Sequence, residues 1–444
     1  MTSTDATPPT PPTYSTKSTD STTASLATRQ RSLGDPESRF PLWPPLTAGC
    51  PVTSTATMAY PLDVDYAYEK ADTDVFGRPG TVAAGSGSGS GSGSRVEGRG
   101  HDRWQQLLPP LLAPGLGEGG TPLIDLGDGI HIKDESRNPT WSHKDRLNRC
   151  TVSAAVGVGA PGIVVASSGN HGASAAAYAA RAGLRCVVLT SPDLPPAVDS
   201  FLHAYGAVVL PVPTHTRWPL LRELVDRLGL HPVSNQTEPA HTGHPFGPEG
   251  YKTIAYEIVG ELGVPAAVFV PTGYGEMLFG VWKGFAELRR LGVTDRVPRL
   301  YACEPAAGGP LTAALRDGTP AARVEVGPTD AYGIDCPVGS YRGVLAVRES
   351  GGRGVLVSDR QMYAAQGELA RQGLWTELSG AAGLAGLRSV RGASGSPLVD
   401  LEGPVVCVAT SSGFKDRAVG TRTSEPVEPS WEGVRGRLRA AGLG

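Results

Sequence analysis

The sequence predicts a mainly parallel α/β fold, because short apolar runs alternate with helical stretches from about residue 100 onward. The run "GIVVA" (162–166) is rich in β-branched residues and leads through the polar turn "SSGNHG" into an Ala-rich stretch (173–183). A second apolar run, "LRCVVLTS" (184–191), follows directly. Strands that alternate with helices form parallel sheets. Such sheets bind ligands at the carboxyl ends of their strands, where these Gly and Ser turns lie.

Further segments repeat this pattern. The strand-like runs are "AVVLPV" (207–212), "AAVFVPTG" (266–273), "RLYACEP" (299–305) and "VVCVATS" (405–411), and the helical stretches include "GYKTIAYEIVGEL" (250–262) and "GVWKGFAELRRLG" (280–292). Ahead of them, "YPLDVDYAY" (60–68) alternates apolar and polar residues, which predicts a small β element.

Composition limits the classes of protein that fit. The chain has 444 residues, enough for two or three folding units, and its formal net charge of −3 gives no overall attraction to nucleic acid or to an anionic membrane. Six cysteines are scattered singly, and no apolar run is long enough to span a bilayer. We therefore expect a soluble, cytoplasmic protein with reduced thiols and with neither nucleic acid nor membrane as a partner.

Shifts in composition suggest the domain boundaries. Residues 1–45 are rich in Ser, Thr and Pro, which predicts a disordered tail, and residues 46–78 form the β arm. A Gly/Ser linker covers residues 79–99. The α/β region extends over residues 100–420, and a C-terminal helix or tail occupies residues 421–444.

Lys144 is the first candidate for chemistry. Ser142 and Asp145 have the spacing of a capping box, which places Lys144 in the first turn of a helix. The helix dipole disfavours an ammonium group there and so helps to lower the pKa of the amine. A lysine with a lowered pKa is suited to Schiff-base formation. The alternative is an ordinary solvated lysine.

Two Gly-containing turns are candidates for anion binding. The backbone amides of Ser167 to His171 would converge at the start of a helix, where a carboxylate fits, and Asn170 adds a side-chain amide. Gly273 and Gly275 follow a strand and leave amides free for a phosphate. Each turn could also be a plain strand-to-helix connection. The second turn does not extend to a dinucleotide motif, because Leu278 stands where the third glycine would be.

Five segments in this order resemble the pyridoxal phosphate enzymes of fold type II in the tryptophan synthase beta-like superfamily, most closely the threonine synthase branch. They are "KDESRNPTWSHKDR", "SSGNHGASAAAYAARAG", "EGYKTIAYEI", "VPTGYGEMLFGVWKGF" and "VVCVATSSGFKD". The resemblance covers the chain from about residue 46 to residue 416, apart from the Gly/Ser stretch. It implies two doubly wound α/β domains with the cofactor, pyridoxal 5′-phosphate, in the cleft between them. The small domain would span about 145–235, and the protein would be a homodimer.

The resemblance also assigns roles to residues. Lys144 would form the Schiff base with the cofactor and move the substrate's Cα proton. The other implied contacts are Asn170 with the cofactor's 3′-oxygen; Gly273, Tyr274, Gly275, Glu276 and Met277 with its phosphate; Thr410 with its pyridine nitrogen; and Ser167, Ser168, Asn170 and His171 with the substrate carboxylate. Thr410 could instead be a satisfied hydroxyl at a strand end, and Lys415 and Asp416 are expected to be exposed.

Several positions depart from the threonine synthase pattern. Gly247 and Pro248 stand where those enzymes usually have an arginine for the substrate phosphate, His171 replaces a threonine, and Glu276 adds a negative charge to the phosphate site. The chain is thus predicted to be a lyase or synthase that acts on an amino acid by β- or γ-elimination or replacement, with a substrate other than phosphohomoserine.

Two other functions remain open at this point. One is authentic threonine synthase, and the other is a non-catalytic paralogue that serves as a partner protein. His241 and His244 have helical spacing, but no cysteine or acidic cluster completes a ligand set, so no metal is expected.

Overall fold

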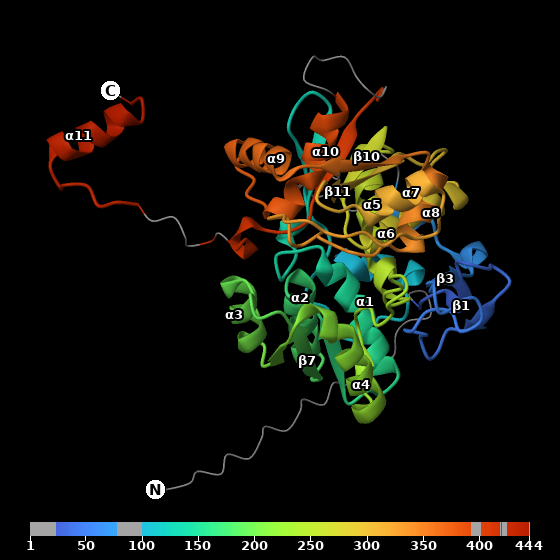
Figure 1. The fold of residues 1–444 in the computed structure, drawn as a ribbon. Helices are drawn as coiled ribbons and strands as arrows, with labels where there is room; N and C mark the ends of the chain where they lie inside the picture. Colours follow the sequence, from blue (N-terminus) through green and yellow to red (C-terminus); the bar gives the residue numbers. More distant parts are fainter. Residues whose placement is uncertain (1–23, 78–99, 392–400, 418, 420–423, 444) are drawn as a thin grey trace, which may run out of the picture.

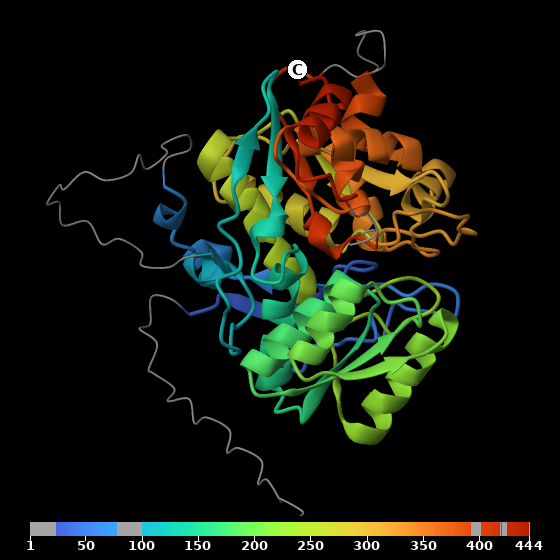
Figure 2. The same ribbon diagram turned by 90° about the vertical axis from the view of Figure 1, so that its left-hand side faces the viewer.

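The computed structural model describes residues 24–77, 100–391, 401–417, 419 and 424–443. Within these residues two α/β units, each built on its own sheet, lie one above the other in Figures 1 and 2. A small antiparallel sheet packs beside them. The predicted α/β class is confirmed, and the sheets of the two units are mainly parallel.

The larger sheet has six strands in the order β12-β11-β10-β13-β5-β4, and only the β4–β5 pair is antiparallel. Its strands are β4 (Leu123–Asp125), β5 (Ile130–Asp134), β10 (Ala267–Pro271), β11 (Arg299–Pro305), β12 (Arg353–Val357) and β13 (Val405–Ala409).

Helices cover both faces of this sheet because its strands are apolar on both sides. Val268 and Val270 face a cluster built with α5 (Gly247–Leu262), α6 (Glu276–Arg290), α7 (Pro310–Asp317) and α8 (Tyr341–Ser350). Phe269, between them, faces α9 (Asp359–Arg371) and α10 (Ala382–Arg391) on the opposite side. This alternation is the period of two that a strand imposes.

The smaller sheet has four parallel strands in the order β8-β7-β6-β9 and appears in green in Figure 2. The strands are β6 (Gly162–Ala166), β7 (Arg185–Thr190), β8 (Val208–Pro211) and β9 (His231–Pro232). Ile163 and Val165 pack in a cluster with α1 (Lys144–Gly157), α2 (Asn170–Arg181) and α3 (Pro196–Ala204). Val164 faces α4 (Arg217–Leu228) on the other side.

Strand order decides which distant segments meet. β10, β13 and β5 are neighbours and parallel, so the residues that follow them lie at one edge of the large sheet. Those residues are 272–277, 410–412 and 135–144. Because α1 begins in the last of these segments and then packs against α2, the same edge faces the smaller unit.

The N-terminal region differs from its prediction. β1 (Ala27–Ser32) pairs with β2 (Arg39–Pro41) and with β3 (Leu62–Tyr66), so the expectation of a disordered tail through residue 45 is wrong for residues 24–45. The β element in "YPLDVDYAY" is present as β3. Residues 1–23 and the Gly/Ser linker at 79–99 lie outside the described residues.

Short 3-10 helices and one terminal helix complete the described chain. The 3-10 helices are η1 (Tyr68–Lys70), η2 (Asp74–Phe76), η3 (Gly100–Leu107), η4 (Glu135–Arg137), η5 (Thr214–Thr216), η6 (Leu378–Ala381) and η7 (Gly413–Lys415). The C-terminal helix α11 (Trp431–Ala440) buries none of its residues and stands apart from the body in Figure 1.

Buried ion pairs join the N-terminal arm to the large unit. Lys283 Nζ in α6 lies 2.7 Å from Asp63 Oδ1 of β3 and 2.7 Å from Glu249 Oε1 of α5. The same amine donates to the Val64 carbonyl at 2.7 Å. Burial on its own would raise the pKa of Asp63, but Lys283 and Arg31 outweigh it and hold this pKa below its usual value of 3.8.

We expect Lys283→Ala to lower the free energy of unfolding by about 3 kcal/mol at pH 7, because it leaves buried carboxylates without their shared cation. Asp63 has a lowered pKa in the folded state, so its contribution is present above its unfolded pKa and is lost as the pH falls through the folded value. The difference between wild type and variant in urea unfolding should therefore shrink below about pH 4. The exposed Lys70→Ala variant is the control, and an equal loss at all pH values would contradict this account.

Candidate active site

The segment before Lys144 is pinned to the segment after β13. Ser142 and Ser411 form an antiparallel β-bridge, and the His143 amide donates to the Thr410 carbonyl at 2.9 Å. Trp141 precedes this bridge with φ of +64°, a left-handed conformation that is strained for a bulky residue. These contacts fix where α1 begins, and Lys144 is its first residue.

The predicted capping box is not formed. The N-cap residue of α1 is His143, which makes no side-chain capping bond. The Asp145 carboxylate turns away and accepts from the Thr140 amide at 2.6 Å and from Ser174 Oγ at 2.6 Å, so it is already satisfied. The lysine therefore does lie in the first helical turn, but the β-bridge, and not a capping box, holds it there.

The surroundings of Lys144 favour a neutral amine. Burial lowers its pKa, and the nearby Glu276, Cys336 and Glu377 oppose this shift only in part. Its Nζ atom lies 5.8 Å from the centroid of the Tyr251 ring. The neutral amine is the nucleophilic form that Schiff-base chemistry requires, and a lowered pKa increases its share.

The "SSGN" turn differs in detail from its prediction. The Ser167 amide donates to the Leu189 carbonyl at 2.9 Å, so this amide does not point to a ligand. The helix α2 starts at Asn170, which leaves the Asn170 and His171 amides in its first turn, where no intrahelical acceptor exists. An anion would thus be held by fewer amides than the sequence suggested.

Asn170 contacts the same segment, residues 410–412, that holds the start of α1 in place. Its Nδ2 atom donates to Glu377 Oε1 at 2.8 Å, and its Oδ1 atom accepts from Ser411 Oγ at 3.2 Å. Thr410, the neighbour of Ser411, is buried directly after β13. The structure therefore brings Lys144, Asn170 and Thr410 together at the carboxyl end of β13, from three separate parts of the sequence.

The predicted phosphate turn follows β10 and ends at α6. Gly275 is its N-cap with φ of +85°, and a Cβ atom built there would lie 2.9 Å from the Gly343 Cα atom, so only glycine fits. A Cβ atom at Gly273 would lie 2.7 Å from the Cys336 sulfur. Met277 points into the hydrophobic core, so its side chain is structural.

Glu276 and Tyr274 in this turn point to the segment 241–244. The Glu276 carboxylate packs against Gly243 and lies 3.8 Å from Arg342 Nη1. The Tyr274 ring stacks on His241, with ring centroids 4.0 Å apart. His241 therefore belongs to the wall of this site rather than to a metal site.

Several charged groups near the site were missed or misjudged from the sequence. Lys415, expected to be exposed, is fully buried, and Asp416 is partly buried, with its carboxylate accepting from the Leu378 amide at 3.1 Å. Glu377 is buried beside Asn170. Arg217, at the start of α4, donates through Nη1 to Ser168 Oγ at 2.9 Å. No sequence signal marked Glu377 or Arg217, because their burial and contacts arise only from long-range packing.

The site has groups that fit pyridoxal phosphate. Four buried polar atoms whose side chains interact with Lys144 have no hydrogen-bond partner among the described residues: His171 Nε2, His241 Nδ1, Tyr251 OH and Glu377 Oε2. Buried polar atoms normally have partners, so these indicate room for a polar ligand. With the buried lysine and the glycine turn ahead of α6, this donor set matches an aldehyde cofactor that carries a phosphate.

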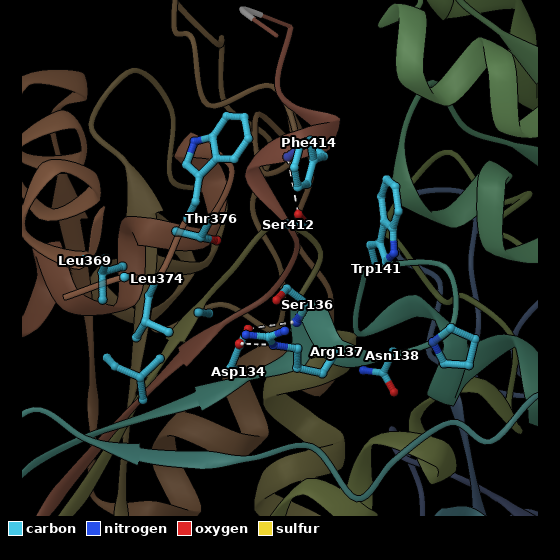
Figure 3. Close-up of a pocket in the computed structure, with 15 residues that line it drawn as sticks. Asp134, Ser136, Arg137, Asn138, Trp141, Leu369, Leu374, Thr376, Ser412 and Phe414 are labelled. Atoms are coloured by element: carbon cyan, nitrogen blue, oxygen red, sulfur yellow. Dashed lines mark hydrogen bonds and ion pairs between the residues drawn. The ribbon is translucent and has the colours of Figure 1, made fainter. Parts of the chain in front are cut away.

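A separate cavity of about 550 Å³ is lined in part by Ala409 and Ser412, at the end of β13 and just after it (Figure 3). Trp141, Trp375 and Phe414 are among the residues that line it, and all three rings are partly exposed. None of the residues predicted for catalysis or cofactor binding lines this cavity. It is therefore not the candidate active site.

Neither a metal site nor a membrane-spanning helix is found in the described part of the chain. No group of three or more His, Cys, Asp or Glu side chains in the described part of the chain could hold a metal ion. His244 instead bonds to His231, with 2.9 Å between their Nε2 atoms. Among the described helices, none has the length and hydropathy needed to cross a membrane.

Comparison with known proteins defines the class. The sequence profile of the family described as pyridoxal-phosphate dependent enzyme matches residues 115–411, and the chain belongs to this family. The fold agrees, since the structure of threonine deaminase isoform 2 from Solanum lycopersicum superposes with a TM-score of 0.54 at 20% identity, covering 73% of this chain and 88% of that one. The protein is thus a pyridoxal phosphate-dependent lyase of fold type II.

Within the family the chain is similar to threonine synthases. It is 34% identical to the enzyme of Methanocaldococcus jannaschii over 329 residues, which cover 70% of this chain and 78% of that protein. It is also 34% identical to the threonine synthase of Mycobacterium tuberculosis over 325 residues, which cover 70% of this chain and 86% of that protein.

We expect Glu276→Gln to bind pyridoxal phosphate about fivefold more tightly at pH 8, because the change removes a carboxylate from the expected phosphate site. Burial raises the pKa of Glu276, so the carboxylate becomes charged, and repels a phosphate, only as the pH rises through that value. Affinity measured by fluorescence titration should fall with rising pH in the wild type and stay level in the variant. Glu223→Gln, on the exposed face of α4, is the control, and weaker binding by Glu276→Gln would refute the assigned position of the phosphate.

Proposed function

We propose that the protein catalyses β- or γ-elimination or replacement on an amino acid, with Lys144 both holding the cofactor and moving the substrate's Cα proton. The observation that carries this proposal is the Lys144 amine, whose pKa burial lowers, at the point where the segments after β5, β10 and β13 meet. A neutral amine can act as a nucleophile and then, once released, as a general base, and the lowered pKa favours this neutral form.

Other residues of the site would support this reaction. Bound pyridoxal phosphate supplies the electron sink that stabilises the carbanion after Cα–H cleavage. Thr410 offers a neutral hydroxyl for the pyridine nitrogen, which would not keep that nitrogen protonated and so suits departure of a β or γ substituent. The Asn170 and His171 amides in the first turn of α2 would bind the substrate carboxylate, together with His171 Nε2, which has no hydrogen-bond partner among the described residues.

The proposed substrate is an amino acid other than phosphohomoserine. In the described structure α5 begins with Gly247 and Pro248, so no guanidinium projects from the start of this helix. Arg217 is held instead at Ser168, on the turn expected to bind the α-carboxylate. Authentic threonine synthase is the second candidate, because the identity to threonine synthases favours it. As the resemblance implies, we further expect a homodimer in the cytoplasm.

Lys144→Ala should abolish the visible absorption of bound pyridoxal phosphate and reduce turnover by at least about 10³-fold, because it removes both the imine-forming amine and the base. The substrate panel would contain L-serine, L-threonine, O-acetyl and O-phospho derivatives of serine and homoserine, with spectra and products recorded for each. Lys70→Ala, which removes an exposed lysine, controls for imine formation at the surface. An unchanged spectrum in Lys144→Ala would refute the assignment, and steady phosphate release with threonine formation from phosphohomoserine would identify a threonine synthase.

We expect Arg217→Ala to raise KM about tenfold for all amino-acid substrates, since a charged hydrogen bond near the α-carboxylate is lost whatever the side chain. Arg217→Lys should recover part of this loss, because it restores the charge but not the geometry. The measurement is KM for one neutral and one phosphorylated substrate. A loss confined to the phosphorylated substrate would instead assign Arg217 to the leaving group.

A further inference from the structure

The Asn170 side chain has a fixed orientation in this structure. Its Nδ2 atom donates to Glu377 Oε1 at 2.8 Å, while its Oδ1 atom accepts from Ser411 Oγ at 3.2 Å. An ionised carboxylate can only accept hydrogen bonds, so Glu377 forces the amide nitrogen, and not the oxygen, to its side. One N–H of Nδ2 then remains without an acceptor in the part of the chain that the structure describes.

Hydrogen bonds hold the backbone around Glu377 against the segment that carries Ser411. The Glu377 amide donates to the Ser411 carbonyl at 3.2 Å, and Thr376 Oγ1 donates to the same carbonyl at 2.6 Å. Thr376 and Ser412 form a β-bridge beside these bonds. The carboxylate is therefore positioned by the same segment that pins the start of α1, and it has little freedom to move relative to Lys144.

Lys415 attracts this buried carboxylate, as it also attracts the buried carboxylate of Asp145. Its side chain is fully buried, and its Nζ atom has no hydrogen-bond partner among the described residues. The same is true of Glu377 Oε2. The ammonium group lies over the face of the Phe201 ring, with Nζ 4.9 Å from the ring centroid. A buried cation near a buried anion favours the ionised form of both groups.

We propose that Glu377 is a positioning residue, which turns Asn170 so that an amide N–H faces the cofactor's 3′-oxygen, and that Lys415 keeps Glu377 ionised for this purpose. The proposal rests on the proposed function, in which Asn170 contacts that oxygen. A donated N–H stabilises a negatively charged 3′-oxygen, whereas an amide carbonyl in the same place would repel it. Glu377 thus acts through Asn170 and does not touch the reacting atoms.

The arrangement predicts a dependence on pH. Burial raises the pKa of Glu377 to about 7, against the opposing attraction of Lys415, while the nearby Asp416 raises it further. Lys144 and Tyr332 also face this carboxylate, and Asp145 faces Lys415 from α1. As the pH falls below about 7, Glu377 gains a proton that it can donate to Asn170 Oδ1, and the amide is no longer held in one orientation.

The test is a pH titration of the visible absorption of bound pyridoxal phosphate, together with its dissociation constant. The wild type should show a spectral transition near pH 7 that Glu377→Gln lacks, and Glu377→Gln should bind the cofactor on the order of tenfold more weakly. Lys415→Met should move the transition to higher pH, because the protonated carboxylate is then favoured. Lys415→Met thus tests whether Lys415 controls the ionisation of Glu377, without altering Glu377 itself.

A double-mutant cycle separates positioning from a general structural role. If Glu377 acts through Asn170, then Glu377→Gln should have almost no effect on affinity or spectrum in an Asn170→Ala background. Glu304→Gln, which alters a buried carboxylate bonded to Thr312, is the matched control and should leave the titration unchanged.

Equal effects of Glu377→Gln in both backgrounds, or a transition near pH 7 that survives in Glu377→Gln, would overturn the proposal. A wild-type protein whose bound cofactor does not absorb through Lys144 would instead overturn the proposed function. The two failures are distinguishable, because the first leaves the wild-type spectrum and its dependence on Lys144 intact.

Discussion

The pairing of the segment before α1 with the segment after β13 is the contact on which the site depends. The Ser142–Ser411 bridge and the bond from the His143 amide to the Thr410 carbonyl join residues more than 260 positions apart. They place the first turn of α1 beside the end of the large sheet. Because α1 then packs against α2 and α5, the same few bonds also fix where the smaller unit meets the larger one.

Most of the fold could be predicted from the sequence because its strands are short, apolar and followed by turn residues. The predicted runs from "GIVVA" to "VVCVATS" all contain strands in the structure. The error lies in β1, "ATRQRS", whose polar residues suggested disorder. Arg31 of this strand pairs with Asp63 and Asp65 of β3, so its charge is neutralised across the sheet. A partner more than 30 residues away leaves no local signal.

The candidate site was predicted in part. Residues in local sequence motifs were predicted, whereas residues that reach the site only through long-range contacts were not. Lys144, Asn170 and the glycine turn stand in local motifs, and the structure brings them together. Their roles remain predictions, since geometry alone does not assign them. The sequence did not predict the site contacts of Glu377, Lys415 and Arg217, because a charged residue is expected to be exposed to solvent. Only the structure shows that Lys415 is buried. It also shows that the Asp145 carboxylate accepts hydrogen bonds from Thr140 and Ser174 and does not cap the start of α1.

The ion cluster around Lys283 has a consequence for the order of events during synthesis. Lys283 and its partner Asp63 are 220 residues apart, so the arm leaves the ribosome long before its cation exists. At translation speeds of about 5–20 residues per second, this interval is roughly 10–40 s. During that time the polar strands of the arm have no core to dock on. The arm can form these ion pairs only after α6 has been synthesised. It is therefore made before the large unit but docks on it late.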